Sequence, residues 1–163
     1  MVWLIPTLLT LHNAEEAIAF RRVWSRMPQL LPEPFATLEA RIPYALMFQA
    51  LVVLSLLAFV LAGVVVMRPG SRVALWLLLA LEAAVAINVV AHALSAIIVF
   101  KGYGPGLATA VLLNAPFAWY ALRRARDEEW VTRRAWRGLL VAGIVLHGPV
   151  LVAGLWLAGA LGA

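Results

Sequence analysis

Long apolar runs separated by short polar stretches dominate the sequence. Four runs are long enough to cross about 30 Å of hydrocarbon, which takes about 17–25 helical residues. They cover Ile42 to Met67, Val73 to Phe100, Gly106 to Leu122 and Gly138 to about Leu161. Val2 to Phe20 forms a fifth run whose second half carries polar residues. Because no run alternates with a period of two, the pattern predicts helices rather than a transmembrane β-barrel.

The connections between these runs have the residues of turns and membrane flanks. Residues 68–72 form a tight turn between arginines, and residues 101–105 form a second turn. Residues 21–41 are the longest predicted loop. Residues 123–137 are predicted to be a charged connector in which Glu129 pairs with Arg133 at i,i+4. Trp130 and Trp136 would then lie at headgroup level.

Composition supports a membrane environment. Hydrophobic residues make up 64% of the 163 residues and charged residues 13%. A soluble domain has about half apolar and a quarter charged residues, so the composition excludes a water-soluble globule. The net charge of +5 is confined to the flanks of the runs, which argues against a nucleic-acid partner. We therefore expect an all-α polytopic membrane bundle of about five helices, one domain over residues 1–163, in a prokaryotic cell membrane.

The distribution of charge predicts an orientation. With five spans, loops 68–72 and 123–137 share one side and carry eight basic residues, while loops 21–41 and 101–105 carry five. The positive-inside rule then places the N-terminus in the cytoplasm. If the first helix enters the bilayer and returns without crossing it, this assignment changes. The expected surroundings are lipid, and a homo-oligomer is compatible with the sequence.

The polar residues inside the apolar runs are the candidates for chemistry, because such residues are costly in lipid. The first helix presents His12, Glu15 and Glu16 on one face at i, i+3 and i+4. The run from Val73 to Phe100 has Asn88 and His92 at i,i+4. Counting about 1.5 Å per residue from the ends of the runs places several of these groups at similar depth. We expect several helices to converge on one polar site. The remaining polar groups, with their weaker signals, are Glu82, Asn114 and His147.

Three explanations compete for two adjacent glutamates in an apolar helix. They can be protonated and hydrogen-bonded to Asn and His, paired with Arg22 or His92, or bound to a metal ion. Carboxylates and imidazoles from facing helices are the usual ligands of metal sites in bundles. The chain has no cysteine, so thiolate sites and disulfides are excluded, and the donors suit Zn, Fe or Mn.

Three motifs together resemble a known family. His12-x-x-Glu15-Glu16 matches the motif that names the HXXEE family of small bacterial and archaeal membrane proteins. Asn88-x-x-x-His92 and Tyr103-x-Pro105-Gly106 match two further motifs described for that family, in the same order. The resemblance covers about residues 12–106. It implies an integral membrane protein with candidate enzymatic residues, and it implies no substrate.

These residues predict a membrane-embedded metal-dependent enzyme. His12, Glu16 and His92 are the expected metal ligands, with Asn88 beside them. Glu15 is expected to be a further ligand or the general base, and Tyr103 a hydrogen-bond donor to a developing oxyanion. Glu82, Asn114 and His147 are supporting or alternative ligands. Hydrolysis of a lipidic or otherwise apolar substrate is the first expectation.

Three other functions stay open at this point. A di-iron-type oxidoreductase would use the same carboxylates and imidazoles to hold two metals. Paired carboxylates and histidines in a membrane also occur in proton- or cation-coupled transporters. A structural protein would use the cluster to set the helix register, although interhelical polar contacts contribute only about 0.6 kcal/mol on average.

Overall fold

The computed structural model describes residues 1–33, 35–150, 152–154 and 156–157, except for the side chain of Leu38. All regular structure in this part of the chain is helical, which confirms the expected all-α bundle. The long helices are α1 (Leu4–Val23), α4 (Tyr44–Met67), α5 (Arg72–Ile98), α7 (Ala115–Asp127) and α8 (Arg133–Val145). Shorter elements are the 3-10 turn η1 (Trp24–Arg26), α2 (Met27–Leu30), α3 (Phe35–Glu39), α6 (Leu107–Thr109), and the π-helical η2 (Ala110–Asn114) and η3 (Leu146–Val150).

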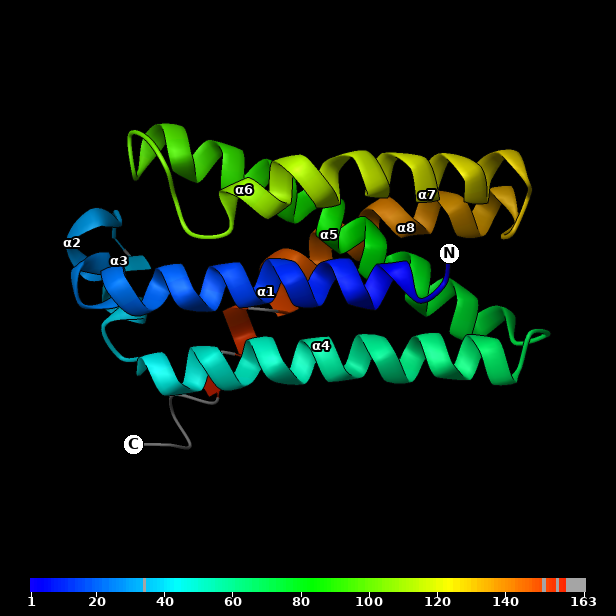
Figure 1. The fold of residues 1–163 in the computed structure, drawn as a ribbon, viewed down its shortest axis with the longest axis horizontal. Helices are drawn as coiled ribbons and strands as arrows, with labels where there is room; N and C mark the ends of the chain where they lie inside the picture. The colour runs from blue at the N-terminus through cyan, green and yellow to red at the C-terminus, as the bar shows by residue number, and fades with distance from the viewer. Residues whose placement is uncertain (34, 151, 155, 158–163) are drawn as a thin grey trace.

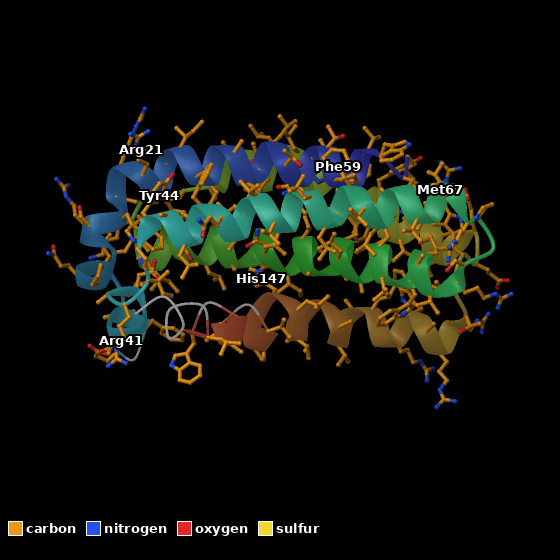
Figure 2. All side chains as sticks on the ribbon, turned by 90° about the horizontal axis from the view of Figure 1, so that it is seen from below. Arg21, Arg41, Tyr44, Phe59, Met67 and His147 are labelled. Carbon is orange, nitrogen blue, oxygen red and sulfur yellow. The ribbon has the colours of Figure 1, made fainter. Side chains whose placement is uncertain are left out.

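The long helices run along a common direction, and the chain turns at two opposite ends (Figure 1). The α4–α5 and α7–α8 turns lie at one end, while α2, α3 and the turn before α6 lie at the other. Arg21 and Arg41 stand at one end and Met67 at the other (Figure 2). This arrangement agrees with the pairing of loops that the five-run sequence pattern predicts.

Three helices are long and apolar enough to cross a membrane. They are Tyr44–Met67, Arg72–Ile98 and Arg133–Gly154. Large apolar side chains on α4 face outward, including Leu56 and Val60, which are each 60% exposed. An outward apolar surface of this kind is suited to lipid contact. Helix α1 and the segment 107–127 are not among the three, so a five-crossing topology stays a prediction.

Small residues let the helices approach closely at the centre of the bundle. Ala58 and Ala62 on α4 have no exposed surface and pack against Leu9 and Ile5 of α1. A Cβ on Gly143 of α8 would lie 2.8 Å from the Ala83 carbonyl carbon of α5. Small residues at helix crossings are the usual means of association in membranes, where lipid provides no hydrophobic drive between helices. This packing joins α1 to α4 and α8 to α5, and Leu78 and Val85 of α5 lie in the same buried clusters as Ile5 and Leu9 of α1.

The structure corrects the predicted charged connector. Residues 123–127 continue α7 and residues 133–137 begin α8, so the connection is only residues 128–132. Glu129 and Arg133 therefore do not share a helix, and the predicted pair is absent from the ion pairs of the described residues. Arg123 pairs with Asp127, and Arg124 with Glu128, at i,i+4. The runs extend further than predicted because arginine is a good helix former at a helix end.

One other predicted boundary differs from the structure, and one cannot be compared with it. The predicted loop 21–41 contains the end of α1 and the short helices α2 and α3. The predicted end of the last run at Leu161 lies outside the described residues. Residues 107–127 form one continuous helical segment that passes through the π-helical turn just before Pro116. Proline removes a helical N–H donor, and a local π turn accommodates that loss.

Candidate metal centre

The polar face of α1 meets α5 near the end of the bundle that carries the 99–106 turn. His12 on α1 has no exposed surface, and His92 on α5 is 9% exposed. Their rings are in edge-to-face contact with centroids 4.8 Å apart. The i,i+4 spacing places Glu16 one turn after His12, so that its carboxylate reaches both imidazoles. The three side chains that the sequence predicts as metal ligands therefore lie together, although they come from two separate helices.

The donor atoms of His12, Glu16 and His92 converge. One ligand atom from each lies within 4.8 Å of the other two. His12 Nε2 is 3.7 Å from Glu16 Oε2, and His92 Nε2 is 3.8 Å from Glu16 Oε1. Both distances exceed those of ordinary hydrogen bonds. They lie close to the roughly 3.4 Å that separates two donors of a tetrahedral ion with bond lengths of about 2.0–2.1 Å.

A buried atom without a partner supports a cation site at this triad. His92 Nε2 is buried and has no hydrogen-bond partner among the described residues. An unsatisfied buried polar atom is costly and needs a specific explanation. The donor set of two imidazoles and one carboxylate is found in catalytic zinc sites, where the fourth position stays open to water or substrate. The residues present therefore fit a divalent transition metal.

Hydrogen bonds orient the His12 ring toward the triad. Thr109 Oγ1 donates a hydrogen bond to Glu15 Oε2, and it lies 2.9 Å from His12 Nδ1. Because the Thr109 hydroxyl donates its proton to Glu15, the same Thr109 oxygen accepts a hydrogen bond from His12 Nδ1–H. The lone pair of His12 then lies on Nε2, where Asn88 Nδ2 donates to it at 2.9 Å. Hydrogen bonding of the second ring nitrogen is what orients metal-binding histidines.

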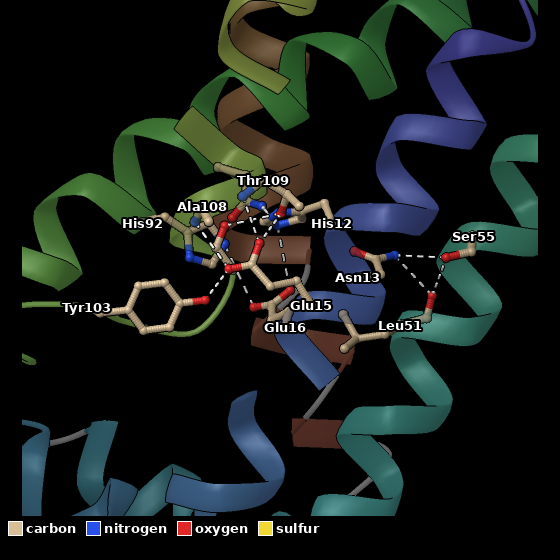
Figure 3. A network of polar contacts seen from close by, with 12 residues as sticks. His12, Asn13, Glu15, Glu16, Leu51, Ser55, His92, Tyr103, Ala108 and Thr109 are labelled. Atoms are coloured by element: carbon tan, nitrogen blue, oxygen red, sulfur yellow. Dashed lines mark hydrogen bonds and ion pairs between the residues drawn. The ribbon is translucent and has the colours of Figure 1, made fainter. Parts of the chain in front are cut away.

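Glu15 binds the start of α6. Its carboxylate accepts hydrogen bonds from the backbone N–H groups of Ala108 at 3.1 Å and Thr109 at 2.7 Å, and from the hydroxyls of Thr109 and Tyr103 (Figure 3). A carboxylate is well placed at the first N–H groups of a helix, which have no partner within the helix. In this conformation Glu15 positions the 103–109 segment, and both of its oxygens are occupied.

Gly106 allows this segment to approach the two histidines. Its φ of +76° lies in the left-handed region that favours glycine. A Cβ at this position would lie 2.7 Å from His92 Cε1 and 2.8 Å from His12 Cε1. Any side chain would therefore collide with both imidazoles. The backbone of Gly106 closes the face of the site that is nearest the turn.

Tyr103 covers the carboxylate of Glu15 from the turn. The residue is 60% exposed and donates its hydroxyl hydrogen bond to Glu15. The hydrogen bond to Glu15 raises the pKa of the Tyr103 phenol, because loss of the proton would break this bond and place two anions side by side.

We expect the Tyr103 phenol to titrate above its ordinary pKa of about 10. The difference in absorbance near 295 nm between wild type and Tyr103→Phe isolates this residue from Tyr44 and Tyr120. In Glu15→Gln the midpoint should fall, because the neighbouring group no longer carries charge. A wild-type midpoint at or below about 10 would contradict the hydrogen bond.

Three further sequence candidates lie outside the triad. Glu82 precedes His92 by ten residues on α5, a distance of about 15 Å along the helix. It therefore cannot share an ion with His92. Asn114 ends η2 and His147 lies in η3, and neither belongs to the triad. Glu82 Oε1 and Asn114 Nδ2 are buried without a hydrogen-bond partner among the described residues. Within the described residues, Glu82 and His147 are not in the group of convergent donors, although His147 is close enough to act electrostatically on both imidazoles.

The other polar residues of α1 have structural partners. Asn13 Nδ2 donates to the Leu51 carbonyl oxygen at 3.1 Å and to Ser55 Oγ at 2.9 Å, which joins α1 to α4 (Figure 3). No ion pair among the described residues joins Arg22 to Glu15. Of the competing explanations for the glutamates, the salt bridge to Arg22 is therefore not formed in this structure. The contact between Glu16 and His92 is formed.

Sequence reasoning missed two residues of the site. Thr109 is a polar residue within the apolar run that begins at Gly106, and a polar residue in such a run is itself a sign of a possible site residue. Gly106 belongs to the Tyr103-x-Pro105-Gly106 motif, but the sequence predicts for it only the start of a helix. Its close approach to two imidazoles depends on how three separate segments meet, and nothing local in the sequence reports such a meeting.

Comparison with known proteins supports the motif assignment. Residues 3–121 match the family described as "Protein of unknown function with HXXEE motif". The chain is 29% identical over 145 residues to the uncharacterized protein YrkK of Bacillus subtilis (strain 168), with 89% of this chain and 84% of that protein covered. No solved structure matches the chain. The match extends past Thr109 and so includes every residue of the site described above.

Proposed function

We propose that this chain, which belongs to the HXXEE family, is a membrane-embedded metal-dependent enzyme that hydrolyses a lipidic or otherwise apolar substrate. The observation that carries the proposal is the convergence of three donors within 4.8 Å, one of which is a buried imidazole nitrogen without a partner. Perturbed ionisable groups gathered inside a bundle are a common mark of a catalytic site. The enzyme would be an integral protein of a prokaryotic membrane.

His12, Glu16 and His92 would hold one Zn, Fe or Mn ion. A bound ion of this kind polarises a substrate oxygen and lowers the pKa of a water molecule toward neutrality. The Glu16 side chain is 15% exposed, so the triad can be reached at its Glu16 edge. Imidazole and carboxylate donors suit all three metals, and three protein donors leave a position open for substrate.

Asn88 would change its orientation when the ion binds. Its Nδ2 currently donates to the same His12 Nε2 lone pair that a metal needs. Rotation of the amide would present Oδ1 to the site instead, where a carbonyl oxygen is a suitable neighbour for a cation. Asn88 thus satisfies His12 before binding and can supply an oxygen afterwards.

Glu15 and Tyr103 would act together in proton transfer and charge stabilisation. Their hydroxyl–carboxylate hydrogen bond occupies Glu15 Oε1. Movement of the exposed Tyr103 ring would free this oxygen to accept a proton, and would leave the phenol able to donate to an oxyanion on the substrate. The hydrogen bonds of Glu15 Oε2 to Thr109 would keep the carboxylate in place during this exchange.

The donor set favours one metal over two. A di-iron site would need further ligands next to the first three, and the described residues contain a single group of three or more candidate donors. Glu82 lies too far along α5 to contribute. Hydrolysis at one ion is therefore the better supported reaction, and the outward apolar surface of the bundle favours a substrate that arrives through the lipid.

The test is metal-dependent hydrolysis by protein purified in detergent. We expect the wild type to carry Zn, Fe or Mn on elemental analysis, and to hydrolyse members of a panel of lipid esters and phosphoesters. Chelation, or the His12→Ala change, should lower the rate by at least about 100-fold. His147→Ala is the matched control and should retain the rate.

Two results would contradict the hydrolase proposal. One is metal-loaded protein that hydrolyses no member of the panel but moves protons or cations across proteoliposome membranes, which would assign the site to transport. The other is hydrolysis that survives both chelation and His12→Ala, which would place the reaction elsewhere.

A further inference from the structure

A cleft lined by arginines and tryptophans lies at the end of the bundle opposite the metal centre. It has a volume of about 960 Å³ and lies between the beginning of α5, the α7–α8 connection and the beginning of α8. Its arginines are Arg72, Arg126, Arg133 and Arg137. We call it the arginine–tryptophan cleft. It shares no residue with the His12–Glu16–His92 site.

The cleft carries an excess of unpaired positive charge. The two acidic residues that line it are Asp127 and Glu129, against four arginines. Asp127 is already paired with Arg126 at 3.2 Å and with Arg123 at 3.4 Å. Among the described residues, Arg72, Arg133 and Arg137 form no ion pair. Guanidinium groups without a carboxylate partner are suited to bidentate recognition of a phosphate.

Helix geometry adds to this positive potential. Helices α5 and α8 both begin at the cleft, at Arg72 and Arg133, and the Ser71 and Thr132 side chains cap them by accepting hydrogen bonds from Ala74 N–H and Ala135 N–H. The N-terminus of a helix carries a partial positive charge that favours an anion. Two such ends and three unpaired arginines therefore face the same space.

Tryptophans give the cleft rigid walls at the depth of lipid headgroups. Trp76, Trp130 and Trp136 line it. Trp76 Nε1 donates to the Ala135 carbonyl oxygen at 3.1 Å, which joins α5 to α8, and Trp130 Nε1 donates to Glu128 at 2.9 Å. Tryptophan is enriched where apolar helices leave the hydrocarbon for the headgroup layer.

An apolar surface continues directly from the cleft. Val73 lines the cleft and is 70% exposed, and Leu77, one turn further along α5, is 42% exposed. A ligand with an anionic head and acyl chains would contact both parts, whereas a free phosphate would contact only the first. Basic pockets beside transmembrane helices are typical sites for anionic headgroups. Because the apolar surface continues from the cleft, a phospholipid would make contacts there that a free phosphate would not make.

We propose that the arginine–tryptophan cleft binds the phosphate of an anionic phospholipid, with the acyl chains along the exposed apolar face of α5. The cleft belongs to the predicted cytoplasmic side, where membranes carry anionic lipid. This binding site is independent of the proposed metal-dependent reaction, because the cleft and the triad share no residue and Arg72 and His92 lie about 30 Å apart along α5.

The test measures binding of dansyl-labelled phosphatidylglycerol to the full chain in neutral maltoside micelles, by energy transfer from tryptophan. We expect unlabelled phosphatidylglycerol to compete at a concentration at least about tenfold lower than phosphatidylcholine does. Inorganic phosphate should fail to compete even in about 100-fold excess. Raising the salt concentration from about 50 to 500 mM should weaken binding, since partly exposed charges are screened.

The double variant Arg133→Gln/Arg137→Gln tests the residues. Each arginine near an anionic headgroup contributes about fivefold to affinity, so the pair should weaken binding about 30-fold. Arg26→Gln/Arg41→Gln is the matched control, because it removes the same charge from exposed positions at the other end, and it should change affinity by less than about twofold. Circular dichroism checks that both variants keep their helices.

Three outcomes would overturn the proposal. Equal loss of affinity in the two double variants would show a response to net charge alone. Equal binding of phosphatidylglycerol and phosphatidylcholine would remove the preference for an anionic headgroup. Competition by inorganic phosphate as effective as that by the lipid would assign the cleft to a soluble phosphate. The salt dependence and the competition series use the wild type, so they decide the question even if a variant fails to fold.

Discussion

Replacing His92 with alanine is expected to abolish tight metal binding. His92 Nε2 is the buried donor of the triad that has no hydrogen-bond partner, so its removal takes away the donor that most needs a cation. His12 and Glu16 alone would leave two protein donors. Since loss of a residue that merely supports a ligand already lowers metal affinity by about 10–100-fold, loss of a ligand should cost at least about 100-fold. Competition with a chelator of known affinity measures this change directly.

His147→Ala is the matched control for this prediction. It deletes the same side chain from the third histidine of the chain, which lies outside the triad, and metal affinity should stay within about twofold. Arg22→Ala should also retain the metal, because no ion pair joins Arg22 to the glutamates in the described structure. Full metal retention by His92→Ala would contradict the site. If Arg22→Ala unfolded a protein that carries no metal, pairing with Arg22 would explain the glutamates instead.

Gly106→Ala is expected to destabilise the protein and to disorganise the metal centre. A residue with a Cβ pays about 1–2 kcal/mol at a left-handed φ, and forcing an atom into a packed site costs about 1–3 kcal/mol more. The new Cβ would lie within 2.8 Å of carbon atoms of both imidazoles, so both rings must move. For a chain of this length, the combined cost should lower the melting temperature by about 5–15 °C. Thermal unfolding in detergent and metal titration measure the two effects.

Gly63→Ala provides the comparison for this change. Gly63 lies within α4, and its added Cβ would meet Trp3 Cη2 at 3.8 Å, an ordinary contact. Alanine is favoured over glycine in a helix by about 1 kcal/mol, so the melting temperature should stay or rise. If Gly106→Ala has the same melting temperature and metal affinity as the wild type, the 103–109 segment is not held against the histidines.

Local periodicity made the helices and the polar face of α1 predictable. Hydropathy located α4 within two residues at its start and α5 within two residues at either end. The i,i+4 spacings correctly placed His12 with Glu16, and Asn88 with His92. Helix ends were less predictable, as the extension of α7 to Asp127 shows. Charged residues at the end of a run are compatible with either helix or loop, and packing decides between them.

Glu15 shows why the roles within the motif could not be assigned from spacing alone. Adjacent residues on a helix point about 100° apart, so Glu15 and Glu16 necessarily face different neighbours. Which of them faces His92 depends on the rotation of α1 about its axis against α5 and the 103–109 segment. The structure turns Glu16 to the imidazoles and Glu15 to Thr109 and Tyr103. The sequence pattern predicts Glu16 as a metal ligand and leaves Glu15 as either a further ligand or the general base, and the structure shows only Glu16 within the group of convergent donors.

Local residue patterns are enough to predict apolar helices with a His/Glu face on α1 and an Asn/His face on α5. Those properties depend on residues within one or two helical turns of each other, where backbone geometry alone sets which side chains are neighbours. Three features follow only from the way the helices pack. Gly106 lies against both histidines, and Thr109 links His12 to Glu15. The start of α5, the α7–α8 connection and the start of α8 enclose arginines that form no ion pair among the described residues. Such meetings join segments distant in sequence, and they depend on how the helices pack and rotate against one another.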